Sequence, residues 1–330
     1  MSAEKTIQVT GVCNALVDIF ADITDQQFSS LGFDKGTMRL VEAAEQKEIL
    51  SKLGGGDRAL CSGGSVANSL IAVAQLGGSS AMICCVGDDE YGKFFKEECS
   101  SMGISVPSSP VPGAHTGTCL SLITPDAERT MRTSLGAAIQ VGPKHIDAKT
   151  IAASSWLFIE GYVFSNGDDG RNGIKEAIRI AKETGTKIAI TCSESWVLQA
   201  FGDPLREALE HAQLVFANEE EAATLSGAQD VVEAGNILSK KFPHVVLTAG
   251  PRGAYIWWEG EQIHVPAYPC EPRDLTGAGD MFAGAFLYGI TNGYKPADAA
   301  KRACFLARDV ISQVGARLKS DVRARWQEAS

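Results

Sequence analysis

The sequence predicts an α/β fold with a mostly parallel sheet flanked by helices. Apolar, strand-like runs recur along the chain, and helical stretches separate them for most of its length. Most of these runs are continuously apolar, which is typical of parallel strands buried on both faces. The chain has 330 residues, 45% of them hydrophobic, which is enough for one large domain of this class.

The expected elements follow one another in a regular order. A first strand at 6–13 leads through a polar region to a helix at 65–77, whose small residues share one face. A strand at 80–87 and a helix at 92–103, closed by Gly103, come next. The remaining strands and helices are expected at 156–164, 173–185, 186–190, 212–218, 230–242, 244–250 and 281–287.

Two regions interrupt this order, at about 15–42 and about 112–135. Both look like short antiparallel strands with turns, and the second alternates like a hairpin around Pro125 and Asp126. We expect these two insertions to form a small, discontinuous, β-rich lid on a single domain that spans residues 1–330. The sequence contains no internal repeat, low-complexity segment or linker that divides it.

Composition disfavours several classes of function. A formal net charge of −10 argues against a nucleic-acid partner, because phosphate backbones favour basic surfaces. The sequence has no run of eighteen apolar residues to span a membrane and no apolar signal segment at its start, so we expect a cytoplasmic protein. Nine scattered cysteines without a CxxC pair indicate a reducing compartment, and five histidines lack metal-site spacing.

The usual nucleotide-binding loops are missing from the sequence. Residues 87–94, GDDEYGKF, nearly match a P-loop, but Phe94 replaces the Ser or Thr that holds Mg²⁺, and three acidic side chains occupy the turn. We interpret this stretch as a solvated acidic turn before a helix. The sequence also has no GxGxxG fingerprint with a downstream acid, which disfavours a nicotinamide enzyme, and no GxSxG elbow.

The stretch DLTGAGD, residues 274–280, places a glycine-rich turn and two aspartates at the start of an apolar helix. Amide groups at a helix N-terminus, together with the helix dipole, favour an anion. An aspartate beside an anion site repels its ligand unless the aspartate has a chemical role. Asp280 is therefore the leading candidate for a catalytic residue.

Polar residues at strand ends provide further candidates. Asn14 and Asp18 follow the first strand, and GGSVAN, residues 63–68, enters the next helix. These side chains suit a polyol, which needs bidentate donors and acceptors, but they equally cap and turn a chain. Asn218 and Glu221 in NEEEA share a helix face and suit Mg²⁺-bound waters, although acidic residues also complement a helix dipole.

These motifs occur in the order of the ribokinase-like (PfkB) carbohydrate and nucleoside kinases, and the sequence resembles that family over nearly its whole length. The resemblance rests on GGSVANSLIAVAQLGG, VGDDEYGKF, NEEEA, TAGPRGAY and DLTGAGDMFAGAF, of which the last is the most specific. It implies a ribokinase-like fold and phosphate transfer from ATP with Mg²⁺. It also implies that Asp280 is the general base and that backbone N–H groups of Gly277, Ala278 and Gly279 form an anion hole.

The resemblance implies roles for the other candidates too. Arg129 would reach from the lid to the transferring phosphate, and Asp274 is structural or lies near a site for a monovalent cation such as K⁺. The residues expected to contact the acceptor hydroxyls are Asn14, Asp18, Gly64 and Asn68. Those expected on the nucleotide side are Asn218, Thr248, Gly250 and Gly253. Those expected to hold Mg²⁺ through water are Asn218 and Glu221.

We therefore predict an ATP-dependent kinase acting on the hydroxymethyl group of a ribonucleoside, namely the 5′-hydroxyl of adenosine, as in adenosine-kinase-like bacterial members of the family. A sugar kinase such as a ribokinase or fructokinase is the alternative. The two-part lid disfavours a vitamin-type kinase, and the intact Asp280 disfavours a non-catalytic sensor. The expected partners are ATP and a small-molecule acceptor, and the expected assembly is a monomer or homodimer.

Apolar residues in the lid favour a nucleoside over a free sugar, because a purine has a flat apolar face to bury. Tyr162 and Phe164, at the end of a core strand, would add a stacking face. The same lid residues are equally suited to forming the lid's own small core. They are Leu16, Ile19, Phe20, Phe28, Phe33, Met38, Cys119, Leu120 and Leu135.

Overall fold

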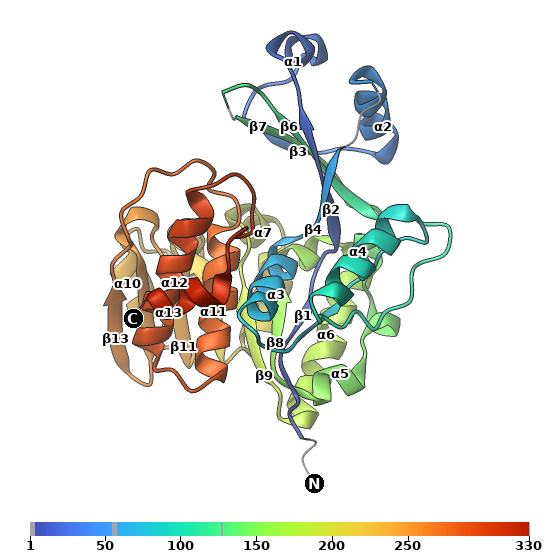
Figure 1. Ribbon diagram of the computed structural model, residues 1–330. Coiled ribbons are helices and arrows are strands. Elements are labelled where there is room, and N and C mark those ends of the chain that lie inside the picture. The colour runs from blue at the N-terminus through green and yellow to red at the C-terminus, as the bar shows by residue number, and fades with distance from the viewer. Residues whose placement is uncertain (1–3, 55–57, 127, 330) are drawn as a thin grey trace.

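The computed structural model describes residues 4–54, 58–126 and 128–329 as a main α/β body with a smaller sheet projecting above it (Figure 1). The main sheet has the order β13-β12-β11-β10-β9-β8-β1-β5. Its six neighbouring strands β5, β1, β8, β9, β10 and β11 pair in parallel, and β12 and β13 add an antiparallel edge. The predicted fold class is confirmed. The strands are β1 (Ile7–Val12), β5 (Ser80–Ile83), β8 (Ser154–Glu160), β9 (Lys187–Thr191), β10 (Leu214–Asn218), β11 (His244–Thr248), β12 (Ala254–Trp258) and β13 (Glu261–Val265).

Helices cover both faces of the main sheet. One apolar cluster packs α3 (Ser65–Gln75), α11 (Ala278–Thr291) and α12 (Pro296–Ile311) against one face. A second cluster packs α6 (Gly167–Thr184), α8 and α10 against the other. Successive strand residues belong to opposite clusters, which explains why the strands are apolar without interruption. The remaining helices of the body are α4 (Glu90–Ser101), α5 (Ala148–Ala152), α7 (Ser195–Ala200), α8 (Gly202–Leu209), α9 (Glu219–Ser226), α10 (Val231–Leu238) and α13 (Val322–Glu328).

The acidic turn at 87–94 has a structural role in starting a helix. Asp89 caps α4, and its side chain accepts hydrogen bonds from the backbone N–H of Gly92 and from the N–H and hydroxyl of Thr116. These three bonds keep the pKa of Asp89 below its usual value despite partial burial. The negative charge of Asp89 is thus stabilised by hydrogen bonds within the protein, and the turn does not form a phosphate site.

The lid is a five-stranded sheet of order β3-β7-β6-β2-β4. The expected hairpin is present as the antiparallel pair β6–β7. Ile19, Phe28 and Leu120 form a small core of the lid itself with its two helices. The lid elements are β2 (Leu16–Asp22), α1 (Asp25–Leu31), β3 (Met38–Leu40), α2 (Ala43–Lys52), β4 (Ala59–Gly63), β6 (Gly117–Ile123) and β7 (Arg129–Ser134).

The first lid segment differs from the expected antiparallel strands. β2 pairs in parallel with β6, because both strands leave the body in the same direction, and β3 pairs in parallel with β7. Helix α1 replaces the expected turn; Thr24 and Gln27 form a capping box at its start, and Gly32 ends it in a left-handed conformation. The segment also continues past residue 42, since β4 returns beside β2.

Among the described residues, the helices are too short or too polar to cross a lipid bilayer.

Candidate active site

A cavity of about 840 Å³ lies between the carboxyl ends of the parallel strands and the lid. Ligands of doubly wound sheets bind at this edge. Strands β1, β8, β10 and β11 bring polar side chains to it at or just beyond their last residues: Asn14, Glu160, Asn218 and Thr248. One face of the lid sheet supplies the roof through Leu16, Asp18, Met38, Leu40, Cys119, Met131, Thr133 and Leu135.

The N-termini of α3 and α11 meet at the floor of this cavity. Small residues allow the two helices to approach: a Cβ atom on Gly284 would lie 2.2 Å from the carbonyl oxygen of Ser69. The first turn of α11 thereby faces the first turn of α3. Two helix N-termini at one point create a region that favours negative charge.

Asp280, in the first turn of α11, lies where these helix ends meet. The Ser65 hydroxyl donates to its Oδ1 at 2.7 Å, and Asn68 Nδ2 donates to its Oδ2 at 3.0 Å. Burial raises the pKa of Asp280 to about 6, and the two hydrogen bonds oppose that rise. The carboxylate is therefore ionised at neutral pH and basic enough to take a proton.

The GAGD turn before Asp280 requires glycine at its first position. Gly277 has φ of +80°, and a Cβ atom there would lie 2.5 Å from the carbonyl oxygen of Ala316. Gly277 is the N-cap of α11, and the first amides of any helix lack acceptors within that helix. Gly277, Ala278 and Gly279 all line the cavity. The amide of Ala278 makes a long hydrogen bond of 3.4 Å to the carbonyl of Leu275, and those of Gly277 and Gly279 have no acceptor among the described residues.

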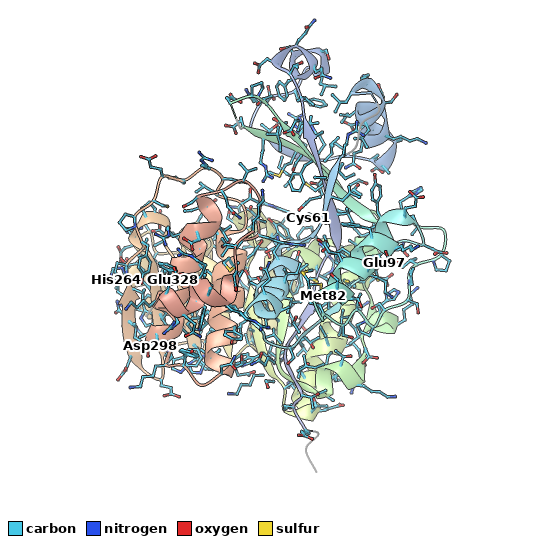
Figure 2. The ribbon with its side chains drawn as sticks, viewed as in Figure 1. Cys61, Met82, Glu97, His264, Asp298 and Glu328 are labelled. Carbon is cyan, nitrogen blue, oxygen red and sulfur yellow. The ribbon has the colours of Figure 1, made fainter. Side chains whose placement is uncertain are left out.

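The other residues expected at the acceptor also line the cavity. Asp18 lies on β2 opposite Cys61, at the junction of lid and body marked by Cys61 in Figure 2. Burial raises the pKa of Asp18 to about 6, while Arg317 and Arg129 oppose the rise. Gly64 has φ of +113° and packs on the backbone of Asn14.

Asn68 and Asn14 each have a partner within the protein. Besides its bond to Asp280, Asn68 leaves its Oδ1 buried and without a partner in the described part of the chain. Asn14 Oδ1 accepts from Asn166 Nδ2 at 2.7 Å. A buried acceptor that lacks a donor is costly, so Asn68 Oδ1 suits a ligand hydroxyl.

Glu160 is a site residue that sequence reasoning missed. It is 1% exposed, lines the cavity, and accepts hydrogen bonds from the backbone N–H groups of Asn14 and Val66, both at 3.3 Å. It thus ties β1 to the start of α3. Burial raises its pKa to about 8. The available signal was a single acid inside the apolar run WLFIEGYVF.

A second missed feature follows β9, where Ser193, Glu194 and Trp196 line the cavity. Ser193 has φ of +68°, a strained conformation for a residue other than glycine, and such strain is common at functional sites. Trp196 lies 6.1 Å from Tyr162, ring centre to ring centre, so Tyr162 does reach the cavity wall. Phe164 instead belongs to the core on the opposite side of the sheet.

Asn218 and Glu221 form a capping box at the start of α9. Glu221 accepts from the backbone N–H of Asn218 at 3.0 Å and from its Nδ2 at 2.7 Å, and Asn218 Oδ1 accepts from the N–H of Glu221. Burial first, and then Glu194 and Glu220, raise the pKa of Glu221 to about 7. The pair therefore caps the start of α9, and the side chain of Glu221 also lines the cavity.

The other three residues expected on the nucleotide side, after Asn218, have different surroundings. Thr248 is paired with Asn218 across β10 and β11 and lines the cavity. Gly250 begins a short 3-10 helix, Gly253 caps its end, and neither is among the lining residues. A Cβ atom on Gly253 would lie 2.0 Å from the carbonyl oxygen of Val265, so its glycine is required by packing against β13.

Arg129 also lies apart from the lining residues. Its Nη1 donates to Asp274 Oδ2 at 2.5 Å. The fold brings these residues together from positions 145 apart in the sequence, a contact that the sequence alone did not indicate.

Comparison with known proteins finds one family over most of the chain. The model of the pfkB family carbohydrate kinases matches residues 42–323. A fructokinase from Klebsiella pneumoniae is 30% identical over 237 residues, covering 70% of this chain and 77% of that protein. The crystal structure of adenosine kinase from Sinorhizobium meliloti has a TM-score of 0.88 at 30% identity, covering 98% of this chain and all of that one. The "probable sugar kinase protein" from Rhizobium etli CFN 42 has the same TM-score and identity, over 98% and 99% of the two chains. The chain therefore belongs to the pfkB family of carbohydrate kinases, phosphotransferases that use an alcohol group as acceptor.

Proposed function

We propose that the protein transfers the γ-phosphate of ATP to the 5′-hydroxyl of a purine ribonucleoside, with adenosine as the preferred acceptor. One observation carries the proposal: Asp280 and the N-terminal amides of α11 share a cavity wall opposite an apolar lid face. The floor offers a base and an anion site, and the roof offers a surface for a heterocycle.

Asp280 is the proposed general base. Its carboxylate accepts the proton of the acceptor hydroxyl as that oxygen bonds to the γ-phosphorus and the bond to the bridging oxygen of ADP breaks. Ser65 and Asn68 hold the carboxylate in place during this step. The amides of Gly277, Ala278 and Gly279 donate to the phosphoryl oxygens, where negative charge accumulates.

The Asn218–Glu221 pair fits a hydrated Mg²⁺. Mg²⁺ keeps several waters and binds with one or two carboxylates plus phosphates, so a single buried carboxylate beside an amide is a suitable donor set. In the described residues no cluster of three or more His, Cys, Asp or Glu side chains could hold the metal directly. When bound, Mg²⁺ would neutralise charge on the ATP phosphates, and Glu221 and Asn218 would orient its waters.

The acceptor assignment is supported by the lid face. Met38 and Leu40 are 47% and 57% exposed, and both line the cavity together with Met131 and Leu135. Exposed apolar side chains that surround a cavity favour a ligand with an apolar face, and a purine has one. Asp18, Asn14 and Asn68 are the proposed contacts of the ribose hydroxyls. We propose a cytoplasmic location for the protein.

A coupled assay of ADP formation tests the acceptor. Adenosine, inosine, guanosine, ribose and fructose are compared as acceptors at one concentration of Mg·ATP. We expect adenosine to have the highest kcat/KM. A free sugar that exceeds every nucleoside by tenfold, about 1.4 kcal/mol of transition-state preference, would reject the nucleoside assignment.

A sugar kinase is the second candidate. It is favoured by the polar half of the cavity, where Asn14, Asp18 and Glu160 lie close to the catalytic floor. It is also favoured by the fructokinase relative and by the Rhizobium etli protein. Transfer to fructose or ribose in the same assay would identify it.

A further inference from the structure

Asp18 packs against the neighbouring strand β4 at the edge of the cavity. The two strands pair with Asp18 opposite Cys61 and Leu16 opposite Gly63. Glycine at position 63 leaves room for the carboxylate, because a Cβ atom there would lie 2.6 Å from Asp18 Oδ2. The position of β4 therefore helps to set the place of the Asp18 carboxylate.

Arg317 holds this part of β4 from a distant position in the sequence. Its Nη2 donates to Ser62 Oγ at 2.9 Å, and its Nη1 lies 3.5 Å from Oε1 of Glu98 on α4. The other oxygen of Glu98 accepts from the N–H of Ser62 at 2.6 Å. Ser62 is fully buried, and the Arg317 side chain is 12% exposed. A guanidinium is thus built into the protein beside the strand on which Asp18 packs.

Arg317 is the strongest of the positive charges that act on the Asp18 carboxylate. Burial raises the pKa of Asp18 to about 6, and Arg317 opposes that rise more than Arg129 does. Arg129 donates to Asp274 at 2.5 Å, so its charge is already engaged. Arg317 has a looser pair, at 3.5 Å, and its Nε has no partner in the described part of the chain. The charged and titratable groups around Asp18 are Arg317, Arg129, Cys119, Asp280 and Cys61.

We propose that Arg317 is a positioning residue of the acceptor site, which holds β4 against Asp18 and supplies the counter-charge that keeps this buried carboxylate ionised. An ionised carboxylate accepts on both oxygens, whereas a protonated one must donate from one of them. The charge therefore allows Asp18 to accept from two hydroxyls at once. Arg317 is not among the residues that line the cavity, so it acts through Asp18.

The titration of Asp18 without any ligand tests the counter-charge independently of the proposed function. In protein labelled with ¹³C at the aspartate carboxyl carbon, the Asp18 signal is identified by its loss in Asp18→Asn. We expect the midpoint of its titration to rise by about one pH unit in Arg317→Met, because an opposite charge nearby lowers a carboxyl pKa by about 1–3. Arg317→Lys keeps the charge and should change the midpoint much less.

Two further variants control this titration. Arg325→Met also removes a partly buried arginine from an ion pair, with Asp309, but Arg325 is not among the charges that act on Asp18. Glu98→Gln removes the other carboxylate beside Arg317 and should lower the midpoint, which also decides the matter if Arg317→Met does not fold. An unchanged midpoint in Arg317→Met, an equal rise in Arg325→Met, or no fall in Glu98→Gln would overturn the proposal.

The kinetic test rests on the proposed function. If the pKa of Asp18 moves from about 6 to about 7, KM for adenosine in Arg317→Met should exceed the wild-type value about fivefold at pH 6 and less than about 1.2-fold at pH 8, with kcat little changed. Asp280 should titrate alike in both proteins, because Arg317 is not among the groups that shift its pKa. A KM that rises equally at both pH values would mean that Arg317 only holds β4, and would overturn the proposal. A wild type that phosphorylates no acceptor would reject the proposed function, and the carbon titration would still decide the role of Arg317.

Discussion

The floor of the cavity consists of strand ends and helix N-termini that are tied together by hydrogen bonds, whereas the roof is the apolar face of a small sheet. Asp280, Asn68 and Glu160 each have partners from other elements. Met38 and Leu40, on the edge strand of the lid, remain largely exposed. The hydrogen-bonded floor is therefore suited to hold the reacting groups in place. The exposed apolar side chains of the roof are suited to select the acceptor.

The largest effect is expected from Asp280→Asn, which removes the base from the floor. A positioned general base contributes about a hundredfold to ten-thousandfold, so kcat should fall by that factor while the acceptor still binds. Because burial raises the pKa of Asp280 to about 6, kcat/KM of the wild type should decline below about pH 6 as the carboxylate is protonated. The variant should show a weaker decline, because Asp18, whose pKa is also about 6, remains in the site. A variant with near wild-type kcat would remove Asp280 from the mechanism.

Asp18→Ala is expected to have the next largest effect. A carboxylate that accepts from two vicinal hydroxyls makes charge-assisted bonds of roughly 1.5–3 kcal/mol each, so acceptor KM should rise by about tenfold to a hundredfold or more. A deoxy acceptor that lacks one of these hydroxyls should bind the wild type more weakly than the full acceptor does. In the variant, the two acceptors should bind with nearly equal affinity. If the two losses simply add, Asp18 does not contact those hydroxyls.

Glu221→Gln should change the metal dependence of the reaction and little else. A neutral amide orders cation-bound water less well, so the Mg²⁺ concentration for half-maximal rate should rise several-fold, on the order of what one weakened ligand contact produces. Gln can still accept from the N–H of Asn218 but loses the acceptor for Asn218 Nδ2, so urea unfolding of the variant is measured beside the Mg²⁺ titration to separate a metal effect from a loss of stability. An unchanged Mg²⁺ titration would leave Glu221 as a helix cap only.

The succession of strands along the chain and the position of the glycine-rich turn before α11 were predictable because both depend on local patterns. Continuous apolar runs predict buried parallel strands, and GAGD before an apolar helix predicts an anion site, which stays a prediction. The lid was harder: whether β2 pairs in parallel with β6 depends on where the body releases each strand, which no local pattern records. The Arg129–Asp274 pair likewise exists only because the folded lid tip reaches the turn.

The apolar lid residues illustrate the same limit. The alternation of apolar residues along the lid strands predicted a sheet with two faces. It did not show which face lines the cavity and which packs against the lid helices. Ile19, Phe28 and Leu120 belong to the lid's own core, whereas Leu16, Met38 and Leu135 line the cavity. The lid-core interpretation is therefore confirmed for one face of the sheet, and contact of the other face with the acceptor stays a prediction.

Glu160→Gln is expected to change the stability of the floor and to leave the chemistry unaltered. The pKa of Glu160 is about 8 in the folded protein and 4.5 for an ordinary glutamate, so the folded state holds the proton more tightly. The free energy of unfolding should therefore fall as pH rises from about 4.5 through 8. Gln still accepts from the amides of Asn14 and Val66 and should be more stable than the wild type at pH 8.5, by about 1 to a few kcal/mol, with little difference at pH 5. Urea unfolding at both values measures this, and a less stable variant at pH 8.5 would show that the two amides keep Glu160 ionised.

The division between floor and roof is tested most directly by one measurement, the ratio of kcat/KM for adenosine to that for fructose. It is determined in the wild type, in Asp280→Asn and in Met131→Ser, which makes the lid face polar. We expect Asp280→Asn to slow both acceptors equally and leave the ratio unchanged. We expect Met131→Ser to lower the ratio by about fivefold to a hundredfold, as loss of most of a buried apolar side chain implies, with kcat for fructose unchanged. A ratio that shifts in Asp280→Asn and stays constant in Met131→Ser would contradict the division.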